Sequence, residues 1–154
     1  MTMTDQLVQA RPAEGQERAR TAAVSPNLAL IKAAYQAFHE RDTEALLDVL
    51  APDVRWIHPD SMSEYNLGGA RHGHAGVRSF LSHVPTVVRA MRIEPQEFLE
   101  SGDRVVVFGV RHVTSAKGST KELKFVHSWT LRDGKATVME DIFDSVPFRR
   151  LIEG

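Results

Sequence analysis

Four long segments that alternate polar and apolar residues, separated by glycine-containing links, fill much of the second half of this sequence. The links are Ser101-Gly102, Lys117-Gly118 and Asp133-Gly134. Links of this kind favour hairpins, so the segments predict consecutive antiparallel strands. We place these strands at about 88–100, 103–115, 120–132 and 135–144. Pro95 marks a bulge or an edge position in the first strand. The sequence therefore predicts a four-strand antiparallel meander.

The residues before the meander show mainly helical patterns. Ser25-Pro26 joins a favoured N-cap to a residue tolerated at the first helical position, and apolar residues then recur at helical spacing to about Arg41. Further helices are expected over 44–50 and 73–84, with a short strand over 53–58 between them. This order indicates an α+β domain in which helices pack on one face of a curved sheet.

The first 24 residues contain no aromatic residue and no sustained amphipathic stripe. We interpret residues 1–24 as a disordered tail and residues 25–154 as one domain, a length typical of single domains. The tail lacks the apolar core of a secretory signal and carries acids that a mitochondrial presequence avoids, and no later stretch is apolar enough to span a membrane. These features predict a cytoplasmic protein with no membrane partner.

Charge and cysteine content narrow the possible functions. The 19 Lys and Arg residues are balanced by 20 Asp and Glu residues, and this net charge of −1 argues against a nucleic-acid partner. The absence of cysteine excludes a disulfide scaffold, a thiol nucleophile and a Cys-ligated metal. The sequence contains neither the phosphate-binding motif G-x-x-x-x-G-K-[ST] nor the motif G-x-G-x-x-G after a strand, so we expect no cofactor. The 7 histidines are then the side chains to follow, because they titrate near neutral pH.

Three local strings occur in an order that resembles a known family. They are DTEALLDVLAPDVRWIHP, HGHAGVRSFL and HSWTLRDGKATVMEDIFD. With the order of elements, they resemble the SnoaL-like and ketosteroid-isomerase-like families of the nuclear transport factor 2-like superfamily over about residues 26–150. The resemblance implies a cone-shaped, cystatin-like α+β barrel, in which a curved, mostly antiparallel sheet wraps around a long N-terminal helix. It also implies an apolar cavity for a small hydrophobic ligand and a homodimer formed through the outer sheet face.

The resemblance also suggests catalytic positions. His58 stands where ketosteroid isomerases carry a base Asp, and His127 stands where they carry a second carboxyl group. Ala34 occupies the position of their Tyr. The residue types differ at all three positions, which argues against steroid isomerisation. Asp141 matches the acid/base Asp of SnoaL-like cyclases, although strand parity alone leaves open whether Asp141 or Glu140 points inward.

The hairpin register extends the predicted pocket to a neighbouring strand. If Lys117-Gly118 is a two-residue turn, Phe108 and His112 lie on the same face as His127. The side chains expected to bind the substrate are mostly aromatic. They are Phe38, Trp56, Phe80, Phe108, His112, Phe125, Trp129 and Phe143.

Two hypotheses of different classes follow. The first is a cofactor-free isomerase, cyclase or lyase, in which Asp141 or His58 is the general base and His127 donates a hydrogen bond to a developing enolate oxygen. The second is a non-catalytic ligand-binding or interaction domain whose histidines are satisfied core residues. His127 and Asp141 within hydrogen-bond or one-water reach in an open cavity would favour the enzyme, whereas a filled interior would favour the second hypothesis. We expect no metal, because no two histidines have metal-ligand spacing on one helix or strand.

Overall fold

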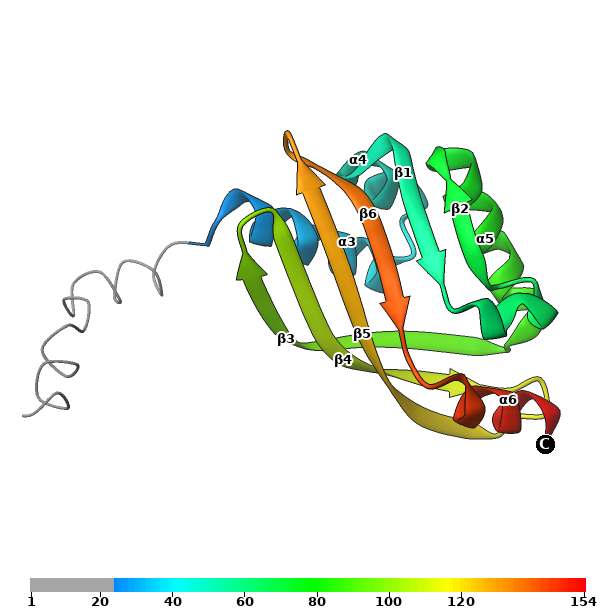
Figure 1. The fold of residues 1–154 in the computed structure, drawn as a ribbon. Coiled ribbons are helices and arrows are strands. Elements are labelled where there is room, and N and C mark those ends of the chain that lie inside the picture. Colours follow the sequence, from blue (N-terminus) through cyan, green and yellow to red (C-terminus); the bar gives the residue numbers. More distant parts are fainter. Residues whose placement is uncertain (1–23) are drawn as a thin grey trace, which may run out of the picture.

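The computed structural model of the chain describes residues 24–154, so the tail predicted for residues 1–24 lies, apart from Val24, outside the described residues. The helices of the described part are α3 (Pro26–Glu40), α4 (Thr43–Val49), the 3-10 helix η1 (Asp60–Tyr65), α5 (Gly73–Val87) and α6 (Ser145–Glu153). Its strands are β1 (Leu50–His58), β2 (Gly69–His72), β3 (Ala90–Ser101), β4 (Arg104–Thr114), β5 (Thr120–Arg132) and β6 (Lys135–Ile142). These strands form one sheet with the order β2-β1-β6-β5-β4-β3 (Figure 1).

The predicted meander is confirmed, since β3, β4, β5 and β6 pair consecutively and antiparallel. β1 joins the other side of β6 and runs parallel to it, with Trp56 opposite Met139 and Ile57 opposite Glu140. In a parallel pair the two strands run in the same direction, so the residues that follow Trp56–Met139 and Ile57–Glu140 along the two strands also lie side by side. This pairing brings His58, at the end of β1, next to Asp141.

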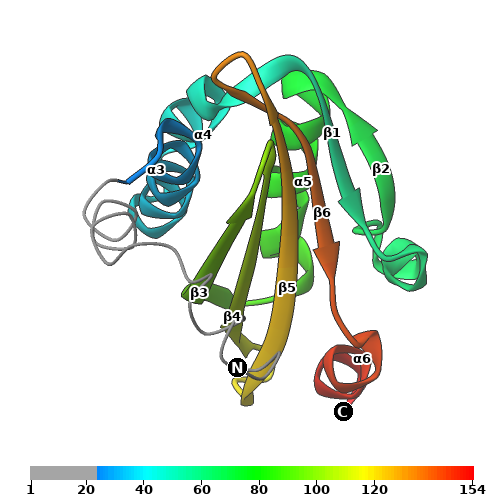
Figure 2. The same ribbon diagram turned by 60° about the vertical axis from the view of Figure 1, so that its left-hand side comes forward.

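The long helix α3 lies on the concave side of the sheet, which curves around it and α5 (Figure 2). Ser25 caps α3 as predicted, because its hydroxyl accepts a hydrogen bond from the backbone N–H of Leu28 at 3.0 Å. Ile31 and Tyr35 are buried from this helix against the core. The α+β architecture with a curved, mostly antiparallel sheet is therefore confirmed.

The hairpin between β4 and β5 differs from the prediction by one residue. A two-residue turn at Lys117-Gly118 would pair residue 116 with residue 119, whereas Thr114 pairs with Thr120 across a five-residue loop, 115–119. Gly118 adopts a φ of +91° in this loop, a conformation that glycine accepts without a steric penalty. Because side chains alternate along a strand, this one-residue shift reverses which face of β4 points inward.

Three elements extend the predicted order. The loop expected before α5 holds η1 and the short strand β2, which pairs antiparallel with β1. The chain ends in α6, whose N-cap is Asp144, as its side chain accepts a hydrogen bond from the N–H of Val146 at 3.0 Å. Phe148 of α6 is buried and closes one end of the core. Among residues 24–154, no helix is long and apolar enough to cross a membrane.

Candidate active site

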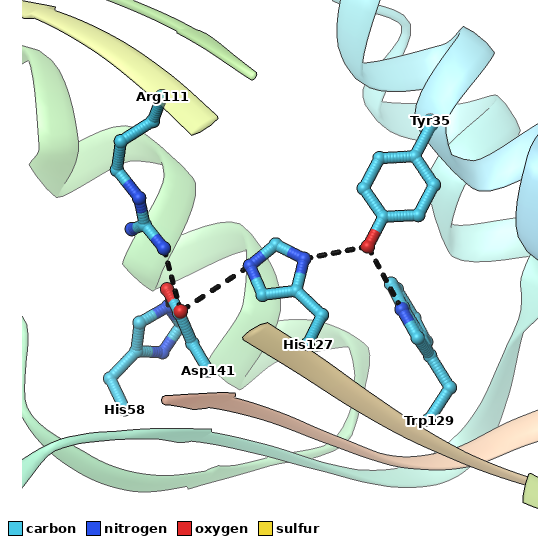
Figure 3. Close-up of polar contacts among 6 residues, drawn as sticks. All are labelled: Tyr35, His58, Arg111, His127, Trp129 and Asp141. Atoms are coloured by element: carbon cyan, nitrogen blue, oxygen red, sulfur yellow. Dashed lines mark hydrogen bonds and ion pairs between the residues drawn. The ribbon is translucent and has the colours of Figure 1, made fainter. Parts of the chain in front are cut away.

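Asp141 of β6 lies at the centre of a buried polar cluster on the concave face of the sheet (Figure 3). Its Oδ1 accepts a hydrogen bond from Nη2 of Arg111 at 2.6 Å. Nε2 of His127 lies 3.4 Å from the same oxygen, and Nε2 of His58 lies 3.4 Å from Oδ2. β1 and β5 flank β6, and β4 follows β5, so the order of the sheet brings these four side chains together. The parity left open by the sequence is thereby decided: Asp141 points inward, and Glu140 is exposed.

A buried tyrosine and tryptophan fix the protonation of His127. Nε1 of Trp129 donates a hydrogen bond to the Tyr35 hydroxyl oxygen at 3.1 Å, and that hydroxyl lies 2.7 Å from Nδ1 of His127. Burial raises the pKa of Tyr35 far above its ordinary value, so the hydroxyl stays protonated and donates a hydrogen bond to Nδ1 of His127. Neutral His127 must then carry its proton on Nε2, facing Asp141.

Asp141 is ionised despite its burial. Burial alone would raise the pKa of Asp141, but the charge of Arg111 and the contacts with His127 and His58 outweigh it and hold the pKa well below its ordinary range. The guanidinium of Arg111 lies between two aromatic rings, 5.1 Å from the centroid of Phe125 and 4.5 Å from that of Phe143. The site therefore contains a buried ion pair.

Both histidines of the cluster are neutral at pH 7. Burial lowers the pKa of His58 and of His127 below the ordinary 6.5, and this effect exceeds the opposing attraction of Asp141. The ring of His58 stacks on Phe80 with 4.0 Å between centroids, and the ring of His127 packs on Phe125 at 4.1 Å. The two imidazoles are thus held in place, and each has a nitrogen next to the carboxylate.

The polar cluster lines a small cavity, here called the inner cavity, of about 50 Å³. Four predicted substrate-binding residues lie in its apolar wall. They are Phe38, Trp56, Phe80 and Phe143. Trp56 and Arg111 each have a buried N–H, on Nε1 and Nε respectively, without an acceptor among the described residues. Buried donors are rarely left unpaired, so each of these two N–H groups is available to the oxygen of a water or a ligand.

The structure corrects the expected positions of two residues. Phe108 is 40% exposed on the outer face of the sheet. His112 lies on the same outer face and pairs with Glu94, 2.8 Å away. The physical reason is the five-residue hairpin loop, which turns the alternate residues of β4 inward. Phe125 and Trp129 face inward as expected, although they pack behind His127 and do not line the inner cavity.

Sequence reasoning missed two residues of the cluster. Arg111 takes the inward position that the predicted register gave to His112. Tyr35 has the helical spacing of the apolar residues of α3, and the family resemblance aligns its neighbour Ala34 with the family tyrosine. The available signal was the alternation along this strand, because Arg111 shares its parity with Val105, Val107 and Val113.

The criteria that separate the two hypotheses give a divided result. His127 and Asp141 are within reach of each other, at 3.4 Å, as the enzyme hypothesis requires. The inner cavity has room for only a few water molecules, as the binding hypothesis expects.

Within residues 24–154, no three His, Cys, Asp or Glu side chains are grouped as metal ligands, and His112 lies on the face opposite His58.

The chain is similar to a known protein family and to several solved structures. The model of the SnoaL-like domain matches residues 31–139. TerC, whose crystal structure was obtained with polyporic acid, is 59% identical in sequence to this chain, and the two structures match with a TM-score of 0.83. The match covers 84% of this chain and 100% of the TerC chain. An NTF2-like protein of unknown function from Burkholderia pseudomallei is 50% identical, with a TM-score of 0.83, and covers 85% of this chain and 100% of that one.

A putative SnoaL-like polyketide cyclase from Jannaschia shares the fold at 16% identity, with a TM-score of 0.72 and coverage of 84% of this chain and 92% of that chain. No curated protein matches the chain. The family model covers most of the described residues, and its fold agrees with the cone-shaped α+β architecture. The chain therefore belongs to the SnoaL-like family of NTF2-like proteins.

Proposed function

We propose that this protein is a cofactor-independent enzyme of the isomerase, cyclase or lyase type, which moves a proton on a small, largely apolar carbonyl compound. The observation that carries the proposal is the buried Arg111–Asp141 ion pair, flanked by two neutral imidazoles in an apolar cavity. Burying such groups is costly, and strongly perturbed pKa values cluster at functional sites. The cluster therefore supports acid-base chemistry better than a purely structural role.

We assign proton abstraction to His58. Asp141 is a weak base, because Arg111 and the two histidines hold its pKa well below the ordinary range. If Asp141 accepts the Nε2 proton of His58, Nδ1 of His58 is left with a free electron pair. Nδ1 can then take a proton from the carbon beside a ligand carbonyl, as the C–H electron pair moves into an enolate. The positive charge formed on His58 lies beside the Asp141 carboxylate.

We assign stabilisation of the enolate oxygen to His127 and its neighbours. The Tyr35 hydroxyl holds His127 in the tautomer with a proton on Nε2, so this nitrogen donates rather than accepts. Trp56 and Arg111 supply two further buried N–H groups that lack an acceptor. Donors fixed in advance in a site of low polarity stabilise a developing negative charge strongly. Return of the proton from His58 to another atom of the enolate would complete an isomerisation.

The ligand of a relative supports this class of compound. TerC, at 59% identity, was co-crystallised with polyporic acid. Polyporic acid is a hydroxylated benzoquinone that carries phenyl rings, so it combines flat apolar rings with acidic enol oxygens. Such oxygens match unpaired N–H donors, and such rings match a wall of Phe and Trp side chains. We therefore propose flat aromatic ketones or quinones as the ligands of this protein.

Deuterium exchange tests the proton transfer directly. We expect the wild-type protein to accelerate exchange of the α-protons of 2-tetralone in D₂O, followed by proton NMR. His58→Gln should abolish the acceleration, because it removes the base. His112→Gln is the matched control, since this histidine lies on the outer face and should leave the rate unchanged. Equal rates for the wild type and His58→Gln would refute the proposal.

A non-catalytic binding protein is the second candidate, and the small volume of the inner cavity favours it. Tryptophan fluorescence can separate the two candidates, because Trp56 and Trp129 are the 2 tryptophans of the sequence and both lie at the site. Binding of polyporic acid that quenches this fluorescence, without any accelerated exchange of 2-tetralone, would identify a binding protein.

We also propose a homodimer formed through the outer sheet face. Phe108 of β4 and Ile142 of β6 are exposed there, at 40% and 50%. Exposed apolar side chains on a sheet face are typical of an interface, and a twofold axis would bury the same patch on both copies. Light scattering should give twice the monomer mass of 17.2 kDa, and Phe108→Lys should shift the mass to the monomer.

A further inference from the structure

We propose that the inner cavity is entered through a second, larger pocket that binds the anionic end of an elongated aromatic ligand; this inference rests on the proposed function. The second pocket, here called the outer pocket, has a volume of about 270 Å³, compared with about 50 Å³ for the inner cavity. Together they reach the lower end of the size range of ligand sites. A ligand too large for the inner cavity alone would therefore occupy both.

Three apolar side chains separate the two spaces. Phe38 of α3, Val84 of α5 and Met91 of β3 line both the inner cavity and the outer pocket. Each comes from a different element, and each is only partly buried. Rotation of such side chains is fast and needs no change in the backbone, and methionine adapts to several shapes. We infer that these three residues form a gate between the spaces.

The end of the inner cavity at α6 and η1 is closed. Phe148 of α6 and Met62 of η1 are 1% and 2% exposed there. Two further contacts hold α6 against η1: Tyr65 donates a hydrogen bond to Glu153 at 2.7 Å, and Arg149 pairs with Glu64 at 2.9 Å. Entry at this end would require α6 to detach, whereas entry from the outer pocket requires only side-chain rotation.

The outer pocket carries two exposed arginines, Arg41 and Arg89. Neither forms an ion pair within the part of the chain that the structure describes. The carboxylate of Asp42, on the same wall, already accepts a hydrogen bond from the N–H of Ala45 at 3.0 Å, where it caps α4. The arginines are therefore available to an anionic group of a ligand.

Arg41 also occupies an unusual backbone position. It follows the last residue of α3 with φ 56° and ψ 35°, in the left-handed region where helices commonly place glycine. A residue with a side chain is strained there, so its presence is a cost to the fold unless the side chain has a use. This geometry is independent of the charge of the pocket and favours the same conclusion.

A third pocket also reaches the polar cluster, but its chemistry is opposite. It includes His58 and Asp141 together with Asp60 and Glu140, which are acidic. His58, Asp141 and Phe143 line both this pocket and the inner cavity, whereas Glu140 is exposed on the outer face of β6. An anionic ligand would be repelled by its acids. The arginine-bearing outer pocket is therefore the entrance that suits an aromatic anion.

A matched pair of dyes tests this inference without any turnover. The anion 1-anilinonaphthalene-8-sulfonate and the neutral N-phenyl-1-naphthylamine share their rings and differ in the sulfonate. We expect the variant Arg41→Gly/Arg89→Gln to bind the anion about three- to tenfold more weakly, with less dependence on salt, and to bind the neutral dye as the wild type does. Arg132→Gln is the control, because this exposed arginine lies outside both pockets.

Two further results would overturn the inference. The first concerns affinity for the dyes. The inference fails if the wild type does not bind the anionic dye, if the double variant binds the anionic dye with unchanged affinity, or if the double variant loses affinity for both dyes equally. The second concerns the gate: Val84→Phe should slow association of the neutral dye in stopped-flow fluorescence, and an unchanged rate would exclude this entrance. Failure of deuterium exchange would refute the proposed reaction but would leave these binding results intact.

Discussion

The Tyr35 hydroxyl makes two buried hydrogen bonds, and its removal gives a sharp test of how the site is organised. Tyr35→Phe keeps the aromatic ring but leaves the N–H of Trp129 and Nδ1 of His127 without partners. An orphaned buried polar group costs about 1–3 kcal/mol, and partial relaxation of His127 reduces the sum, so we expect a loss of about 2–4 kcal/mol in the free energy of unfolding. For a domain of this size, that loss corresponds to a fall of roughly 6–14 °C in Tm.

The sequence supplies a matched control, because Tyr65 is the other of its 2 tyrosines. The Tyr65 hydroxyl donates to Glu153 at 2.7 Å on the surface, where water can replace the bond, so Tyr65→Phe should cost less than about 0.5 kcal/mol. Calorimetry measures both values. Nitrogen-15 NMR of the His127 ring should show an unprotonated Nδ1 in the wild type and a mixture of tautomers in Tyr35→Phe. Equal losses of stability in the two variants, or an unchanged ring spectrum, would refute the reasoning.

Three further predictions concern pH and the backbone. Burial keeps the pKa values of His58 and His127 below 6.5 in the folded chain, so the unfolded chain binds more protons than the folded chain as the pH falls below 6.5. The free energy of unfolding, measured by urea denaturation, should therefore fall by up to about 2.7 kcal/mol for each pH unit below 6.5. A flat profile would contradict this. Arg41→Gly should raise the free energy of unfolding by about 0.5–1 kcal/mol, measured by urea denaturation, because glycine accepts φ 56° without strain. Gly109→Ala should lower Tm in a thermal melt, since its Cβ would clash with the backbone oxygen of Glu94 and lie 2.7 Å from the ring of Phe125. An unchanged Tm would contradict this close packing of β3 against β4.

Much of the fold follows from local patterns. The alternation and glycine links predict the meander from β3 to β6, and Ser25-Pro26 predicts the start of α3, because both signals depend on neighbouring residues alone. The elements that the patterns missed are short or terminal. β2 has 4 residues and α6 has 9, so neither offers enough periods of hydrophobic alternation to stand out.

The candidate site shows where local patterns stop. The family resemblance pointed to His58, His127 and Asp141, which the fold brings together from β1, β5 and β6. Arg111 was missed because a hairpin loop of five residues, rather than two, reverses the faces of β4. The role of Tyr35 was missed because its spacing fits an apolar stripe, and only the packing of α3 against β5 brings its hydroxyl to His127.

The sequence by itself thus determined the order of elements, the curved α+β class and three of the four ionisable residues of the cluster. The order of elements and the fold class depend on spacing along the chain, which the sequence records directly, and the three residues stand at positions that match motifs of the resembling families. The tertiary structure alone decided that Asp141 rather than Glu140 points inward, that Arg111 pairs with it, and that two pockets meet at Phe38. These features depend on strand register and on contacts between residues far apart in the chain, where a shift of one residue changes every neighbour.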